Sequence, residues 1–361
     1  MTMSINYSIP EFWTGEIERT AELANSLIKQ AGDDVAAFVW ASDLHIPDAT
    51  SGNTRRIGAL FSATMDACNL SNVVVCGDIG TQYSIESEEK LDEMYKEFPN
   101  NLSPLWGDER LLLTVGNHDG CYGFVNGNHY AMQYGHQKLF DTFFKDQYKH
   151  ENRRFSREGT YFYADDTKQK LRYIMLNSHF GGDYSTDEYG AAKNDRFRIS
   201  CYGQEQLDWL INEALDMPEG YGAIIASHVP LSYDDIGHPD KEQLRNIIRA
   251  YCNRTVYDGC VDIDPESFAY SSVHADFTSA KGEILAVLAG HVHHDWAFTD
   301  ILPCPIVTIV ASGGDLAPGS CTARVFETDC ETSYDIVVIN RRERVIDLVR
   351  VGAGYDRRIE Y

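Results

Sequence analysis

The chain of 361 residues lacks the features that mark several classes of protein. No stretch approaches the ~20 consecutive apolar residues that cross a bilayer. The N-terminus from Met1 to Ile28 has no basic start followed by an apolar run, so it does not resemble a secretory signal. Internal repeats, low-complexity tracts and proline-rich linkers are also missing. We therefore expect a cytoplasmic protein with a single domain over residues 1–361 and no membrane partner.

Cysteine occurs in no pattern that would give it a structural role. The nine cysteines are an odd number, are scattered from Cys68 to Cys330, and include no CxxC pair. Without a secretory signal, a chain of this length is not expected to carry a disulfide framework. We expect the cysteines to be small core residues rather than metal ligands.

Basic residues are too few for a surface that binds nucleic acid by charge. The chain has 31 Lys and Arg against 55 Asp and Glu, a formal net charge of -24. Such a balance repels a phosphate backbone unless a local basic groove exists. The local basic clusters are limited to Arg153-Arg154 with Arg157, and Arg341-Arg342. The charge favours solubility and argues against nucleic acid as a partner.

The first part of the chain alternates short apolar runs with helical patterns. Runs at 35–41, 73–76 and 111–115 predict buried strands, and 56–67 and 86–98 predict helices between them. This rhythm is typical of an α/β fold with a parallel sheet. In such sheets, ligands bind beyond the carboxyl ends of the strands.

The same kinds of sequence pattern predict further elements. We expect an N-terminal helical lead-in within residues 1–34, and an insertion or cap at about 232–282 with its own helix at 241–250. Apolar runs predict more strands at 160–164, 171–177, 223–226, 284–289 and 306–311. A hairpin is expected near the C-terminus, with strands at 335–340 and 344–351.

Metal-ligand side chains follow five of the predicted strands. Their recurrence at strand ends, in five segments of one chain, favours a metal site. The segments are Asp43-Leu44-His45, Gly77-Asp78, Gly116-Asn117-His118-Asp119, His228 and Gly290-His291-Val292-His293.

Each segment has a chemical reading of its own. Residues two apart on an extended chain point the same way, so Asp43 and His45 would grip one cation. Asp78 offers two oxygens that can bridge two cations, and Asn117 offers a neutral amide oxygen. His118 would face the substrate as a general acid. Asp119 would orient that ring or cap the turn.

Imidazoles complete the predicted ligand set. His228 follows a strand, and His291 and His293 repeat the spacing of two residues. His294 breaks that alternation and is not expected to be a ligand, whereas His179 could reach the edge of the site. Oxygen and imidazole ligands without thiolate suit Mn, Fe, Zn or similar ions. Phosphoester hydrolysis is the reaction that two such ions, ~3.5–4 Å apart, serve best.

These motifs together resemble the calcineurin-like metallophosphoesterase superfamily. The resemblance runs from about Val35 to Ala311 and includes the segment from Tyr202 to Leu210 before the fourth motif. It implies a four-layer α/β/β/α sandwich of two mixed sheets flanked by helices. It also implies a hydroxide that bridges two metal ions and attacks phosphorus, with His118 assisting the leaving group. One ion would be held by Asp43, His45, Asp78 and His293, and the other by Asp78, Asn117, His228 and His291.

Differences from two known branches of the superfamily narrow the expected function. The Asp-Arg-Gly that follows the Gly-Asp motif in Ser/Thr protein phosphatases is missing, and Thr81 stands where purple acid phosphatases place a tyrosine ligand. The substrate is therefore expected to be a small or medium phosphoester, either a monoester or a diester. One alternative is a nuclease of the same superfamily, which would need a basic groove. The other is a non-catalytic binding protein on the same fold. Such a protein could lack a metal ligand or His118, whereas every expected position is filled in this chain. The oligomeric state is not determined. The C-terminal segment from Arg350 to Arg357 resembles chain endings in the superfamily, a likeness that carries no chemistry.

Overall fold

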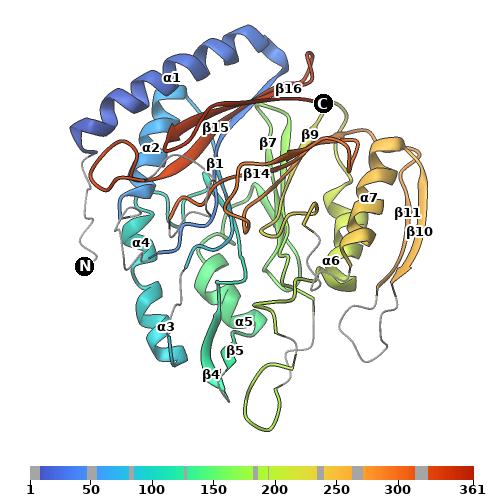
Figure 1. The fold of residues 1–361 in the computed structure, drawn as a ribbon. Coiled ribbons are helices and arrows are strands. Elements are labelled where there is room, and N and C mark those ends of the chain that lie inside the picture. Colours follow the sequence, from blue (N-terminus) through green and yellow to red (C-terminus); the bar gives the residue numbers. More distant parts are fainter. Residues whose placement is uncertain are drawn as a thin grey trace.

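The computed structural model has two large mixed sheets with helices on their outer faces (Figure 1). This confirms the predicted α/β class and two-sheet architecture. No helix in the described part of the chain is long and apolar enough to cross a membrane. Thr81 lies outside the described residues, as do 234–239 and 262–270 of the expected insertion. The structure describes residues 9–46, 55–80, 85–125, 128–181, 186–193, 195–233, 240–261, 271–313 and 324–361.

The first sheet combines N-terminal and C-terminal strands. Its order is β17-β16-β15-β1-β2-β3, with β1, β2 and β3 parallel and β15 antiparallel to β1. The parallel strands are buried apolar runs, as predicted, and the C-terminal hairpin extends the sheet from β1. The strands are β1 (Val35–Ala41), β2 (Val73–Cys76), β3 (Leu111–Thr114), β15 (Ser333–Asn340), β16 (Val345–Gly352) and β17 (Arg357–Glu360).

The second sheet has a parallel centre and antiparallel edges. Its order is β13-β14-β12-β9-β8-β7-β6, in which β14, β12, β9 and β8 run parallel. The carboxyl ends of these central strands therefore meet along one edge. The strands are β6 (Arg153–Phe155), β7 (Phe162–Asp166), β8 (Leu171–Met175), β9 (Gly222–Ala226), β12 (Glu283–Ala289), β13 (Ala297–Phe298) and β14 (Ile306–Thr308).

Helices cover the outer faces of both sheets (Figure 1). The expected helix at 86–98 is the shorter helix α3, and a second helix with a proline in its first turn begins at Phe98. The helices are α1 (Glu11–Ala31), α2 (Ile57–Cys68), α3 (Glu88–Tyr95), α4 (Phe98–Asn101), α5 (His136–Leu139), α6 (Gly203–Trp209) and α7 (Lys241–Asn253). A 3₁₀ turn spans Gly32–Asp34, and π-helical turns continue α5 and α6 over Phe140–Phe144 and Leu210–Ala214.

The described part of the 232–282 segment belongs to the outer layer of the second sheet. Leu244, Ile247 and Ile248 of α7 are fully buried in the core cluster that also contains Val287 of β12. A hairpin of β10 (Val256–Val261) and β11 (Ser271–Asp276) lies beside α7 (Figure 1). A cap over the site stays a prediction.

Two hairpins were not predicted from the sequence. One is β10 and β11, although the alternation of buried and exposed residues in β11 has the period of two that marks a strand. The other is formed by β4 (Cys121–Val125) and β5 (Asn128–Gln133), in a polar stretch without an apolar run. Both hairpins stand apart from the two large sheets.

The two sheets meet through aromatic side chains. Phe38 of β1 and Tyr173 of β8 are buried, and their rings form an edge-to-face pair with centroids 5.3 Å apart at 89°. Such pairs contribute beyond the area that they bury. The pair is part of a core cluster that contains residues of both sheets, and it helps to hold the first sheet against the second.

Phe38→Ala should lower the free energy of unfolding by about 3–5 kcal/mol, because a large ring is lost between sheets that cannot collapse onto the cavity. Urea denaturation followed by circular dichroism measures this value. Leu23→Ala is the control, since Leu23 is 38% exposed on α1. A loss for Phe38→Ala no greater than that for Leu23→Ala would contradict packing of the sheets through this ring.

Candidate metal centre

The predicted ligands lie where strands of both sheets end. Asp43 and His45 follow β1, and Asp78 follows β2. Backbone hydrogen bonds join these loops, from Asp43 N to Gly77 O and from His45 N to Asp78 O, each 3.0 Å long. In the second sheet, Gly290 N donates to His228 O at 2.9 Å. The loops that carry the ligands are therefore fixed by the backbone before any ion binds.

Five of the ligands have left-handed backbone conformations. Positive φ is uncommon for residues other than glycine, costs energy, and concentrates at functional sites. The expectation that Asp43 and His45 sit on an extended chain is therefore wrong, because the chain turns sharply after β1. The φ angles are 54° at Asp43, 48° at His45, 49° at Asp78, 68° at His291 and 54° at His293.

One half of the site gathers around Asp43. Asp43 Oδ1 lies 3.2 Å from His293 Nε2, and His293 Nε2 lies 3.3 Å from His45 Nε2. Donor atoms of these three side chains all lie within 4.8 Å of one another. A carboxylate and two imidazoles at this separation could hold one cation.

The other half gathers around Asp78 and Asn117. Asp78 Oδ2 lies 3.1 Å from His228 Nε2, and Asn117 Oδ1 lies 3.0 Å from both His228 Nε2 and His291 Nδ1. Asp43, Asp78 and His228 also have donor atoms within 4.8 Å of one another, which joins the two halves. His291 and His293 therefore face different halves of the site, although only one residue separates them.

The donor set fits a pair of cations. Asp43 and Asp78 are 0% and 1% exposed, and burying two carboxylates together is costly unless positive charge compensates them. Glycines make room for these carboxylates, because a Cβ at Gly116 or Gly290 would collide with Asp78 or Asp43. All seven predicted ligands converge here, and none is a thiolate.

Side chains behind the ligands hold them in place. Asp119 accepts hydrogen bonds from the backbone N–H of Gly80 and Gly116 at 2.8 Å and of Ile79 at 3.2 Å. Of the two roles considered for Asp119, the contacts therefore support capping of the loops. Burial, reinforced by the charge of Asp78, raises the pKa of Asp119 to about 7. The Nδ1 of His228 lies 2.7 Å from Cys76 O, which directs Nε2 into the site.

The imidazoles of the site differ from one another in how they titrate. Burial opposes a charge on His228, but the adjacent Asp78 overcomes it and raises the pKa of His228 to about 9. Burial lowers the pKa of His45 and of His291 to about 4. Burial opposes ionisation of Asp43, but His293 lowers the pKa of that carboxyl to about 2. In the protein alone, His228 therefore supplies positive charge that a cation would replace.

A cavity of about 440 Å³ opens beside the second half of the site. The ring of His118 lies between those of His45 and Phe197, with centroids 5.0 Å from each. His179, expected near the edge of the site, lines the cavity and is 6% exposed. Sequence reasoning missed Phe197, Arg198 and Ser200, because their loop carries no motif. The lining residues are Asn117, His179, Phe197, Arg198, Ser200, Val229 and His291.

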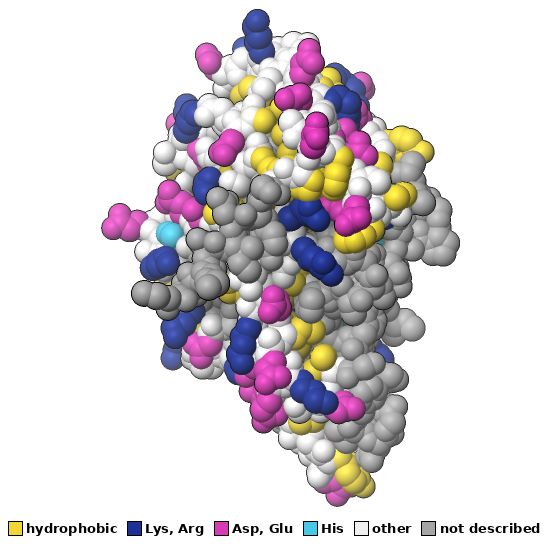
Figure 2. Space-filling model, turned by 90° about the vertical axis from the view of Figure 1, so that its left-hand side faces the viewer, with side chains coloured by type: hydrophobic (Ala, Val, Ile, Leu, Met, Phe, Trp, Pro, Cys, Tyr) yellow, Lys and Arg dark blue, Asp and Glu magenta, His cyan; other side chains and the backbone are white. Residues whose placement is uncertain are grey.

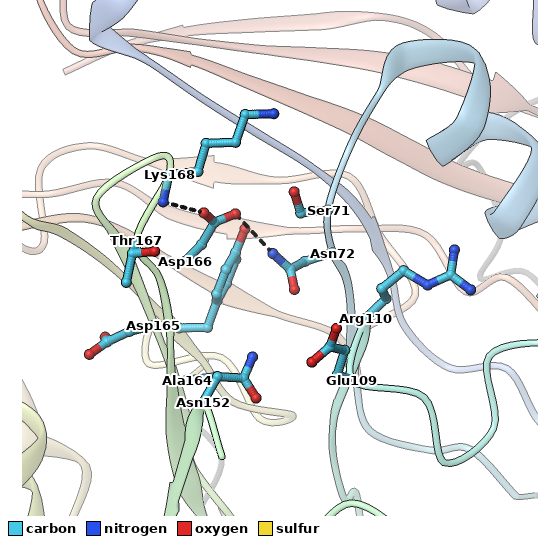
Figure 3. Close-up of a pocket in the computed structure, with 11 residues that line it drawn as sticks. Ser71, Asn72, Glu109, Arg110, Asn152, Ala164, Asp165, Asp166, Thr167 and Lys168 are labelled. Carbon is cyan, nitrogen blue, oxygen red and sulfur yellow. Dashed lines mark hydrogen bonds between the residues drawn. The ribbon is translucent and has the colours of Figure 1, made fainter. Parts of the chain in front are cut away.

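A second cavity, of about 370 Å³, lies near the start of β2 and β3 and contains none of the predicted ligands (Figure 3). Several of its polar groups already have partners within the protein. Asn72 Nδ2 donates to Asp166 Oδ2 at 3.2 Å, and Arg172 pairs with Asp165 at 2.7 Å.

His294, the histidine that is not expected to be a ligand, stacks on Trp296, and the ring centroids are 4.7 Å apart.

Comparison with known proteins agrees with this geometry. The family model for calcineurin-like phosphoesterases matches residues 36–295. The chain therefore belongs to the calcineurin-like phosphoesterase family. A crystal structure of a dimetal phosphatase from Danio rerio is similar in fold, with a TM-score of 0.55, 12% sequence identity, and coverage of 90% of this chain and 98% of that one. No curated protein matches the chain.

Asp78→Asn should lower the pKa of His228 in the metal-free protein from its value of about 9, because the charge of Asp78 is the main effect that opposes burial, and only the weaker effects of Asp43 and the Cys76 carbonyl remain. In the metal-free protein, the raised pKa means that the stability contributed by His228 is complete below about pH 6.5 and is lost as the pH rises through about 9. An NMR titration of the imidazole nitrogens measures the pKa. The exposed His274, which pairs with Asp258, should titrate identically in both proteins. An unchanged His228 would contradict the pairing with Asp78.

Proposed function

We propose that this protein hydrolyses small or medium phosphoesters at a centre of two metal ions. The observation that carries the proposal is the convergence of seven side chains with oxygen and imidazole donors, Asp43 and Asp78 among them, within a family of phosphoesterases. Two bound cations of the Mn, Fe or Zn type would clamp the phosphate and lower the pKa of a water nucleophile.

The residues of the chain take distinct roles in this proposal. Asp43, His45 and His293 would hold one cation, Asn117, His228 and His291 the other, and Asp78 would contact both. His118 would donate a proton to the leaving oxygen, since its ring lies beside that of His45 and its backbone N–H is fixed by Asp78 Oδ1 at 2.8 Å. Asp78 thereby connects the ligand set to the proposed acid.

The surroundings of the site support a compact substrate. The cavity beside Asn117 and His291 is of the size that holds small molecules, and the ring of Tyr233 lies 5.7 Å from that of His291. On the face drawn in Figure 2, basic side chains are interspersed with acidic ones. With a net charge of -24, this pattern does not favour the alternative of a nuclease. A cytoplasmic location stays a prediction.

Removal of metal should abolish hydrolysis, and Mn²⁺ should restore it. The assay is a panel of p-nitrophenyl phosphate, its bis ester, nucleotides, cyclic nucleotides and glycerophosphodiesters, run after EDTA treatment with and without added metals. Asp78→Asn should remain inactive at every metal concentration, because both ions lose a shared ligand. A fully metal-loaded wild-type protein that hydrolyses no ester of the panel would refute the proposed activity.

His118→Gln should lower kcat by about 10²–10⁴-fold on alkyl phosphoesters, whose leaving group needs a proton. On p-nitrophenyl esters the loss should be much smaller, because p-nitrophenolate leaves without protonation. His274→Gln is the control, since His274 is exposed on β11. Equal losses on both kinds of ester would assign His118 a role other than general acid.

A further inference from the structure

Four charged side chains, of which Arg350 and Asp335 are fully buried, form a network beside the loop that carries His291 and His293. Arg350 donates to Asp295 Oδ1 at 2.8 Å and to Asp335 Oδ1 at 2.6 Å. Arg357 lies 2.7 Å from Asp335 Oδ2 and 3.3 Å from Asp295 Oδ1. Arg350 and Asp335 are 1% and 0% exposed. The network joins three C-terminal strands to a residue that follows His293 by two positions.

Asp295 is held from a second direction by β14 and the residues after it. Its Oδ1 also accepts from the backbone N–H of Val310 at 3.1 Å. Thr308 donates from its hydroxyl to His294 O at 2.6 Å, and its own carbonyl accepts from Arg357 at 2.8 Å. The backbone on the far side of His293 is therefore fixed at both His294 and Asp295, and Arg357 contributes to each attachment.

The opposite end of the same loop is fixed by a proposed ligand. The backbone N–H of His291 approaches the carboxylate oxygens of Asp43 at 3.1 and 3.2 Å. Between these two attachments, His291 and His293 hold left-handed φ angles of 68° and 54°. Such conformations persist only where the surroundings over-determine them. The network constrains the backbone just after His293 through its contacts with Asp295.

Stability alone is a poor explanation for this network. Well-packed hydrophobic side chains in place of buried ion pairs are often as stable or more stable, because the charges lose their hydration. Its position beside the ligands gives the charges another purpose. Residues that orient metal ligands from behind typically change metal affinity by about 10–100-fold when they are altered.

We infer that Asp295, Arg350 and Arg357 are positioning residues that set the geometry of His291 and His293 for cation binding. Asp295 is the last residue of the family match, and its partners Asp335, Arg350 and Arg357 lie beyond it. The C-terminal strands, to which the sequence alone assigns no chemistry, thus serve the metal centre. The inference rests on the proposed two-cation site, and it does not depend on which ester is hydrolysed.

The experiment compares two neighbouring arginines of β17. Arg357→Gln removes a positive charge near the site, so a Coulomb effect alone would tighten cation binding. Loss of positioning predicts the opposite, a weakening of Mn²⁺ binding by about 10-fold or more. Arg358→Gln makes the same charge change one residue away, where Arg358 pairs with Asp347 and its side chain is 52% exposed. It should leave affinity within about twofold of wild type.

Isothermal titration with Mn²⁺ measures affinity, and the visible absorption of the Co²⁺-loaded protein reports ligand geometry. Asp295→Asn provides a second variant in case Arg357→Gln does not fold, and Arg357→Lys should recover part of the lost affinity. Binding as tight as wild type in folded Arg357→Gln or Asp295→Asn would overturn the inference, even where melting temperatures fall. A wild-type protein that binds no Mn²⁺ would overturn the metal centre and the inference together, whereas tight binding without hydrolysis would count against the activity alone.

Discussion

The two carboxylates Asp43 and Asp78 are buried where the two sheets meet, and the site is arranged around their charge. In the protein alone, the raised pKa of His228 keeps a positive ring beside them. A pair of cations would replace that charge and release His228 as a neutral ligand. The negative charge of the two carboxylates must be balanced both with and without bound cations. Loops from both sheets therefore bring ligand side chains to them.

The fold meets this demand by tying loops to one another before any ion binds. Asp119 caps the loops after β2 and β3 through three backbone N–H groups, and Asp43 anchors the start of the loop after β12. Five of the seven proposed ligand residues have left-handed backbone conformations. Their strain can be held because the Phe38–Tyr173 contact and the parallel strand ends leave the loops little freedom.

Charge also organises the molecule beyond the ligands. The Asp295–Arg350–Asp335–Arg357 network crosses from the second sheet to the first, at the loop that holds His291 and His293. The first sheet therefore contributes to the site twice, through the ends of β1 to β3 and through the C-terminal strands. The cavity lined by Phe197, Arg198 and Ser200 lies beside Asn117 and His291.

The sequence by itself determined the class of fold, its main strands and the identity of the seven proposed ligands, because buried strands are short apolar runs and metal donors belong to few residue types. The spacing of two residues implied a shared direction for His291 and His293, so their assignment to different ions came only from the family resemblance; the left-handed backbone is what turns them to different halves of the site. The sequence could not reveal Phe197 beside His118 or Arg350 beside Asp295. Those contacts join residues 55 or more positions apart, and only the packing of the two sheets brings them together.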